Sequence, residues 1–120
     1  MRAVKIDYDA LPWKQFRDNT GLHYKPVKVA NLGFSKFRWD AGVAEKWHSH
    51  DQEPQILLCL SGRVEFGIRD EAGERMEVLK AGDVMLIQPG VEHRAQVTEP
   101  TEMLVMFSPM NRFDADAVIV

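Results

Sequence analysis

From Lys25 onward, the chain consists of short runs of strand-forming residues separated by turn residues. In the run over residues 63–69, apolar residues occupy the even positions and polar residues or glycine the odd ones. Neighbouring side chains of a strand point to opposite faces, so this alternation predicts a strand with one buried face. The other runs cover residues 27–39 (broken near 31–33), 45–50, 55–60, 75–79, 84–88, 92–98 and 102–107. Short strands at such regular spacing predict an all-β barrel or sandwich.

Composition narrows the class of protein further. The 120 residues are enough for one domain, and 45% apolar with 28% charged residues argues against intrinsic disorder. A net charge of −3 gives no electrostatic signature of a nucleic-acid or membrane partner, and no apolar run is long enough to span a bilayer. The N-terminus reaches an acidic residue before any apolar signal region, and Cys59 is the single cysteine. We therefore expect a cytoplasmic protein.

One strand is apolar on both of its faces. After Gln55, the run that ends at Leu60 has no polar position. The outer face of such a strand needs a cover, and in a chain of this size a second subunit is the simplest one. The sequence therefore predicts a homodimer.

Three histidines stand in strand contexts at a spacing that suits a metal. His48 and His50 are two residues apart, so on a strand both imidazoles project from the same face. Gln55 follows after a short turn, and His93 begins a later strand. Three imidazoles and an amide oxygen that converge inside a barrel form a site for a first-row transition metal with positions open to substrate. His23 has no neighbour at ligand spacing, and we read it as structural.

The glycines around these histidines extend the pattern. The chain reads Gly-x5-His-x-His-x4-Gln-x6-Gly from Gly42 to Gly62, and Gly-x5-Gln-x-Gly-x2-His from Gly82 to His93. These two stretches resemble, in order and spacing, the two signature motifs of the cupin superfamily. The resemblance implies a jelly-roll β-barrel with the site in its interior. It assigns residues 1–26 to an N-terminal arm, 27–108 to the barrel and 109–120 to a C-terminal tail.

The resemblance also implies a ligand set, and the departures from it are informative. His48, His50 and His93 fall on the histidine ligands of the family, and Gln55 falls on its glutamate ligand. Glutamine in place of glutamate removes a negative charge from the metal site. The implied cofactor is one divalent transition metal per chain, of the group Zn, Ni, Mn and Fe.

A shell of three histidines and one glutamine is similar to that of two kinds of cupin. These are the small pectin-degradation cupins, which open unsaturated uronate rings, and certain polyketide cyclases; both use the metal without redox chemistry. The segment 105–112 resembles the end of the pectin-degradation cupins, but Val105 stands where they carry a catalytic aspartate and Asn111 where they carry an arginine. Arg112, one residue on, is our candidate for binding a substrate carboxylate.

The predicted function is thus metal-dependent isomerisation or ring opening of a small polar metabolite such as a sugar acid. Gln55 and Arg112 are its candidate catalytic residues. Two alternatives stay open: an iron-dependent dioxygenase, since shells of three histidines also activate oxygen, and a non-catalytic module that binds a small molecule.

Overall fold

The computed structural model describes residues 1–108 and 117–119, and it contains strands and one short 3-10 helix. The elements in chain order are η1 (Tyr8–Ala10), β1 (Lys14–Phe16), β2 (Asn19–Val29), β3 (Leu32–Trp39), β4 (Gln55–Ser61), β5 (Arg63–Asp70), β6 (Gly73–Lys80), β7 (Val84–Ile87), β8 (Glu92–Gln96), β9 (Thr101–Phe107) and β10 (Val118–Ile119). The all-β prediction is confirmed. No helix in the described part of the chain is long and apolar enough to cross a bilayer.

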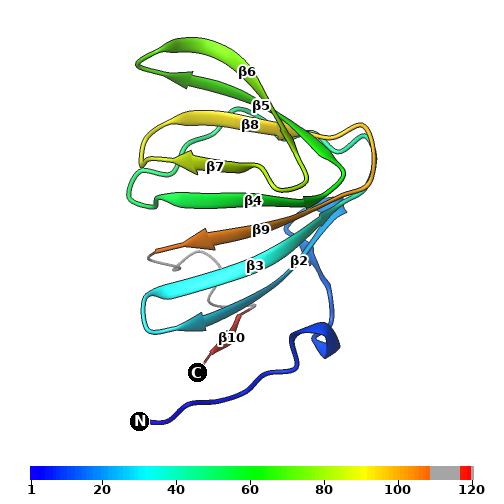
Figure 1. The fold of residues 1–120 in the computed structure, drawn as a ribbon, viewed down its shortest axis with the longest axis vertical. Coiled ribbons are helices and arrows are strands. Elements are labelled where there is room, and N and C mark those ends of the chain that lie inside the picture. The colour runs from blue at the N-terminus through cyan, green and yellow to red at the C-terminus, as the bar shows by residue number, and fades with distance from the viewer. Residues whose placement is uncertain (109–116, 120) are drawn as a thin grey trace.

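The strands form two sheets that face each other (Figure 1). The larger sheet has the order β1-β2-β3-β9-β4-β7, and β10 adds to it beside β2. The smaller sheet has the order β6-β5-β8. Apart from the parallel pairing of β10 with β2, neighbouring strands are antiparallel. The jumps from β3 to β9 and from β5 to β8 bring distant parts of the chain together, as in the expected jelly roll.

Residues 14–26, which are predicted to belong to an N-terminal arm, form β1 and most of β2 in the larger sheet, joined by a turn at 17–18. The register pairs Leu22 with Trp39 and Tyr24 with Phe37, and these four side chains are buried. The alternation of Leu22 and Tyr24 with less apolar neighbours is the sequence pattern that could have predicted a strand here. Only the segment before β1 runs outside the sheet, where the Tyr8 hydroxyl donates to the Lys25 carbonyl at 2.7 Å.

The prediction of a strand over residues 45–50 is wrong. The structure has two isolated bridges instead, Ala44 with Gln96 and His48 with His93. Three residues lie between the bridges on one side and two on the other, so one extra residue interrupts the ladder. The Ala95 amide donates to Glu45 Oε1 at 3.1 Å, where a regular ladder would offer it a backbone carbonyl.

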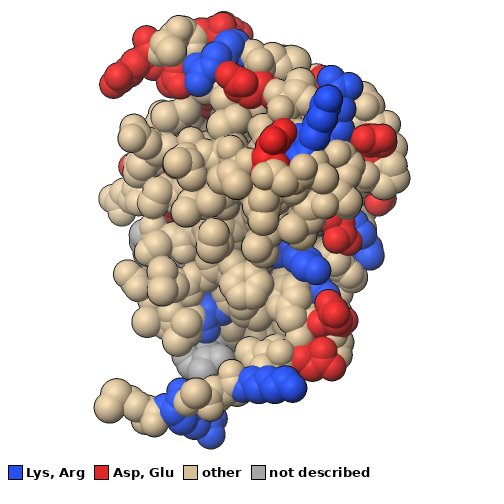
Figure 2. Space-filling view, in the orientation of Figure 1, with Lys and Arg blue, Asp and Glu red and all other residues tan. Residues whose placement is uncertain are grey.

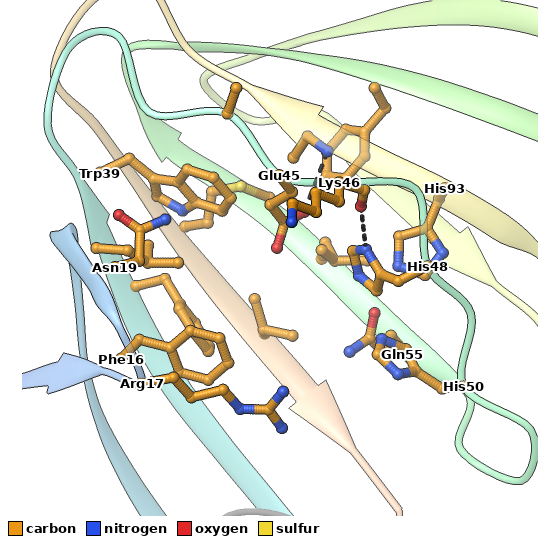
Figure 3. Close-up of a pocket in the computed structure, with 18 of the residues that line it drawn as sticks. Phe16, Arg17, Asn19, Trp39, Glu45, Lys46, His48, His50, Gln55 and His93 are labelled. Carbon is orange, nitrogen blue, oxygen red and sulfur yellow. Dashed lines mark hydrogen bonds between the residues drawn. The ribbon is translucent and has the colours of Figure 1, made fainter.

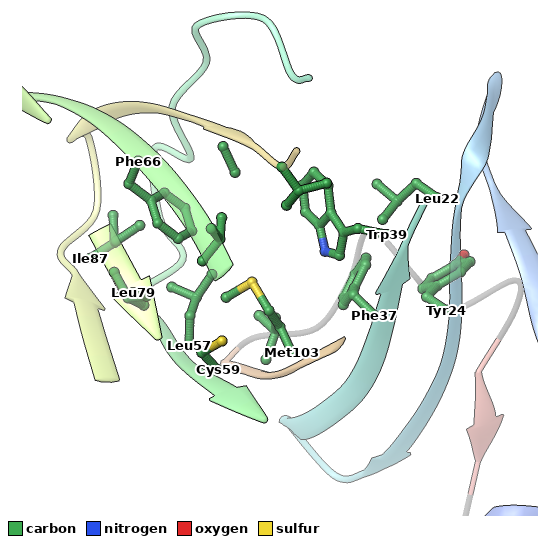
Figure 4. Close-up of a cluster of buried hydrophobic side chains, with 14 of the residues drawn as sticks. Leu22, Tyr24, Phe37, Trp39, Leu57, Cys59, Phe66, Leu79, Ile87 and Met103 are labelled. Atoms are coloured by element: carbon green, nitrogen blue, oxygen red, sulfur yellow. The ribbon is translucent and has the colours of Figure 1, made fainter. Parts of the chain in front are cut away.

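The core side chains lie between the two sheets (Figure 4). β4 shows how a strand contributes to the core, since Leu57 and Cys59 are buried while Ile56 and Leu60 face outward. Burial raises the pKa of the Cys59 thiol above its ordinary value. Cys59 thus packs as a small apolar side chain.

Candidate metal centre

His48 and His93 are held together by their own backbones. The His48 amide donates to the His93 carbonyl at 3.0 Å, and the His93 amide donates to the His48 carbonyl at 2.9 Å. Two residues that exchange both hydrogen bonds face each other directly across an antiparallel pair. The two imidazoles therefore lie side by side, with ring centroids 4.3 Å apart.

Backbone carbonyls also fix the orientation of both rings. His48 Nδ1 lies 2.7 Å from the Lys46 carbonyl oxygen, and His93 Nδ1 lies 2.9 Å from the Val91 carbonyl oxygen. A carbonyl only accepts, so each Nδ1 carries the proton and Nε2 is the nitrogen able to ligate a metal. Such outer contacts are typical of metal-binding histidines, because they set the tautomer before the metal arrives.

His50 completes the cluster from the loop before β4. The Gly90 amide donates to the His50 carbonyl at 2.9 Å, which ties this loop to the turn preceding β8. The ring of His50 lies 5.1 Å from that of His48 and 5.2 Å from that of His93, measured between centroids. The ligand atoms of the three histidines all lie within 4.8 Å of one another. The three side chains can thus hold one metal ion.

Gln55 begins β4 and is buried in the same cavity as the histidines. Figure 3 shows its amide beside His50. Three imidazole nitrogens and a neutral amide oxygen are a donor set that suits divalent first-row metals. The residues present therefore fit a divalent transition metal, as the sequence predicts.

The cavity that holds the cluster has a volume of about 550 Å³. That size suits a small metabolite. Its apolar wall consists of Phe16, Leu22, Phe37, Trp39, Leu57, Phe66, Met103, Val105 and Phe107. Its charged rim consists of Arg17, Asp18, Glu45 and Lys46, of which Figure 3 labels Arg17, Glu45 and Lys46.

The structure differs from the sequence-based picture of the site in two respects. Val105 is buried in the cavity wall, so no carboxylate occupies this position beside the cluster. Arg112 lies outside the described residues, and its proposed role stays a prediction.

Sequence reasoning missed the charged rim altogether. Glu45 and Lys46 belong to the loop that carries His48, so their closeness to the histidines in the chain was a usable signal. Arg17 and Asp18 carried no such signal, because their stretch of sequence indicates only a turn.

Trp47, which alternates with His48, points away from the cavity. Its ring packs against Gly67 of β5, where a Cβ would lie 2.9 Å from Trp47 Cη2. The guanidinium of Arg69 lies 3.8 Å from the centroid of the ring, and that of Arg94 lies 4.9 Å from it. Trp47 thus anchors the histidine loop on the outside of the smaller sheet.

Comparison with solved structures supports the fold. KdgF from Halomonas sp. matches with a TM-score of 0.71 and 25% sequence identity, over 84% of this chain and 90% of that one. An RmlC-like cupin from Shewanella frigidimarina matches with a TM-score of 0.75 and 20% identity, over 91% and 92% of the two chains.

An oxalate decarboxylase variant from Bacillus subtilis matches with a TM-score of 0.74 and 20% identity. It covers 91% of this chain, which spans only 30% of that enzyme. No curated protein matches the sequence. The family model of the cupin domain matches residues 36–107, which include the three clustered histidines and Gln55. The chain therefore belongs to the cupin family.

Proposed function

We propose that this cupin is a metal-dependent enzyme that isomerises a small polar metabolite, or opens its ring, without consuming oxygen. A sugar acid is the first substrate class to test. The proposal rests above all on one observation: His48, His50 and His93 converge at one end of a cavity large enough for a monosaccharide. The likeness to KdgF at 25% identity and the resemblance to the pectin-degradation cupins favour this chemistry over others.

The neutral ligand set carries the chemical argument. A divalent ion held by three imidazoles and the Gln55 amide supplies Lewis acidity, which polarises hydroxyl and carbonyl oxygens of a substrate. Gln55 contributes no negative charge, so it preserves more of that acidity than a glutamate would. The backbone contacts of His48 and His93 keep both rings in one orientation without cost at the moment of binding.

Proton transfer in this proposal falls to the charged rim. Asp18 and Glu45 both line the cavity, whereas Val105 supplies no carboxylate. The Ala95 amide donates to Glu45 Oε1 and so holds this carboxylate in position. Glu45 is therefore our first candidate to accept a proton from the substrate, and Asp18 the second.

The test compares metals and oxygen in parallel. Metal-free protein is loaded separately with Zn, Ni, Mn or Fe, and ring opening of an unsaturated uronate is followed in air and under argon, with oxygen uptake recorded. Turnover should require metal and proceed equally under argon. Strict dependence on iron, with oxygen consumed in step with product, would establish the dioxygenase alternative. Saturable binding without product would establish the binding module.

Two variants connect the result to the site. His48→Ala combined with His50→Ala should abolish metal binding and turnover together, as seen by metal analysis of the purified protein. Gln55→Glu should retain the metal but slow turnover about tenfold, which corresponds to about 1.4 kcal/mol in the barrier. The reason is that the added negative charge weakens the Lewis acid. A double histidine variant with full metal occupancy would contradict the site.

A further inference from the structure

We propose that Arg17 reaches into the cavity from the side that faces the histidine cluster and binds a carboxylate of the substrate there. This inference rests on the proposed function and adds to it the residue that recognises the acid group of the substrate. Arg17 stands on the turn between β1 and β2, far from the histidines in the sequence, yet it lines the same cavity. Figure 3 shows its side chain running along the cavity toward the side that carries His50 and Gln55.

The backbone of the hairpin decides where Arg17 stands. Phe16 pairs with Asn19, so Arg17 and Asp18 form a two-residue loop, and Arg17 occupies its first position with φ 54°. Glycine is the usual residue for a positive φ at this place. Ala30 has a nearly identical φ of 53° at the first position of the β2–β3 loop, outside the cavity. The backbone conformation of Arg17 therefore does not by itself indicate a binding role. The location of its side chain in the cavity does.

The charge of Arg17 is unmatched within the described part of the chain. No carboxylate of residues 1–108 or 117–119 forms an ion pair with its guanidinium, which stacks on the adjacent Phe16 ring at 5.1 Å from the centroid. The planar guanidinium donates two parallel hydrogen bonds to a carboxylate, a geometry that lysine lacks. Lys46 adds a second positive charge to the rim.

The shape of the cavity then defines the ligand. Hydroxyl or carbonyl oxygens at one end of a small molecule meet the histidine cluster, and a carboxylate at the other end meets Arg17. Apolar side chains, among them Phe16 and Phe37, line the same cavity. Such a site selects an acidic sugar over its neutral counterpart, because only the acid satisfies both ends.

Binding measured without turnover tests this assignment. The metal-loaded full-length protein is titrated calorimetrically with a saturated hexuronate and with the matching neutral hexose. The wild type should bind the uronate at least tenfold more tightly than the hexose. Arg17→Gln should weaken uronate binding by roughly 10- to 100-fold and leave hexose binding and metal content unchanged. Arg17→Lys keeps the positive charge but loses the two parallel hydrogen bonds of the guanidinium. Its affinity for the uronate should lie between those of the wild type and Arg17→Gln.

Matched glycine variants separate binding from folding. Arg17→Gly and Ala30→Gly each place glycine at a positive φ, so both should keep or raise the unfolding temperature, and only Arg17→Gly should lose the preference for the uronate. Three results would overturn the assignment: a wild type that does not prefer the uronate, an Arg17→Gln variant that keeps the preference, or an Arg112→Gln variant that alone removes it. Since the saturated uronate need not react, these results stand whether or not the protein opens rings.

Discussion

The outer faces of the two sheets are covered in different ways. On the smaller sheet, Trp47 lies over Gly67 and is flanked by Arg69 and Arg94. On the larger sheet, β9, β4 and β7 carry a group of exposed apolar side chains, and Figure 2 shows few charges over these strands. We call this surface the apolar face; its most exposed members are Ile56, Leu60, Val84, Leu86 and Met106.

The apolar face is continuous because of the strand register. Ile56 pairs with Leu86 on one side and with Met106 on the other, so the three outward side chains form one row. The N-terminal segment covers only the neighbouring strands, where Tyr8 lies 5.2 Å from Phe34 between ring centroids. The contrast shows that the chain covers the smaller sheet with its own loop, the one that carries Trp47 and His48. For the other sheet we expect a second copy of the chain to be the cover.

The largest expected effect follows from a charge on the apolar face. The wild type should have a mass of about twice 13.7 kDa by light scattering. Ile56→Lys should reduce that mass to one chain, since a twofold interface would bury the new charge twice, at a cost on the order of several kcal/mol. Met76→Lys is the control, because Met76 is 52% exposed on β6 of the smaller sheet, and it should leave the mass unchanged. A monomeric wild type at high concentration would contradict the dimer.

A smaller effect should come from removing the cover of the smaller sheet. Trp47→Ala should lower the free energy of unfolding by about 2 kcal/mol, since a partly exposed tryptophan contributes less than a fully buried one. Metal affinity should fall with it, because Trp47 anchors the loop of His48. Urea denaturation and a metal titration measure the two effects.

Gly67→Ala sharpens this prediction through a double-mutant cycle. In the wild type the added methyl group meets Trp47, so the variant should be destabilised by about 1 kcal/mol. In the Trp47→Ala background the contact is gone, and alanine should be neutral or slightly stabilising. Equal effects in both backgrounds would show that Trp47 does not pack on β5 in solution.

The smallest effect concerns the exposed edge of the smaller sheet. The hydrogen bond from Arg75 Nη1 to Asp70 Oδ1, 2.7 Å long, lowers the pKa of the Asp70 carboxyl below its ordinary value. A lowered folded-state pKa means that the pair stabilises the fold above pH of about 3.9 and loses this effect as the pH falls through the folded pKa. Arg75→Gln should bring the pKa of Asp70 back up, as NMR titration of its carboxyl carbon would show. The stability change should be far below that of Trp47→Ala, since exposed ion pairs contribute little.

The sequence by itself determined the class of fold and the histidine cluster. Both depend on short-range patterns: strands alternate with a period of two, and turns of fixed length return the chain at fixed spacing. The spacing of His48 and His50, with the motif that ends at His93, predicted the cluster, and the cluster forms although residues 45–50 are not a continuous strand. The alternation of Leu57 and Cys59 with outward residues on β4 follows from the same period.

Only the tertiary structure decided which other side chains line the cavity beside the cluster. Arg17 reaches the cavity because β1 and β2 pair at the edge of the larger sheet, and nothing near Arg17 in the sequence encodes that contact. The interruption of the strand over residues 45–50 was equally beyond the local sequence. It involves a hydrogen bond from the Ala95 amide, on a distant strand, to Glu45 Oε1. Local patterns fix the direction of a side chain, but which side chains meet depends on the pairing of strands that are far apart in the sequence.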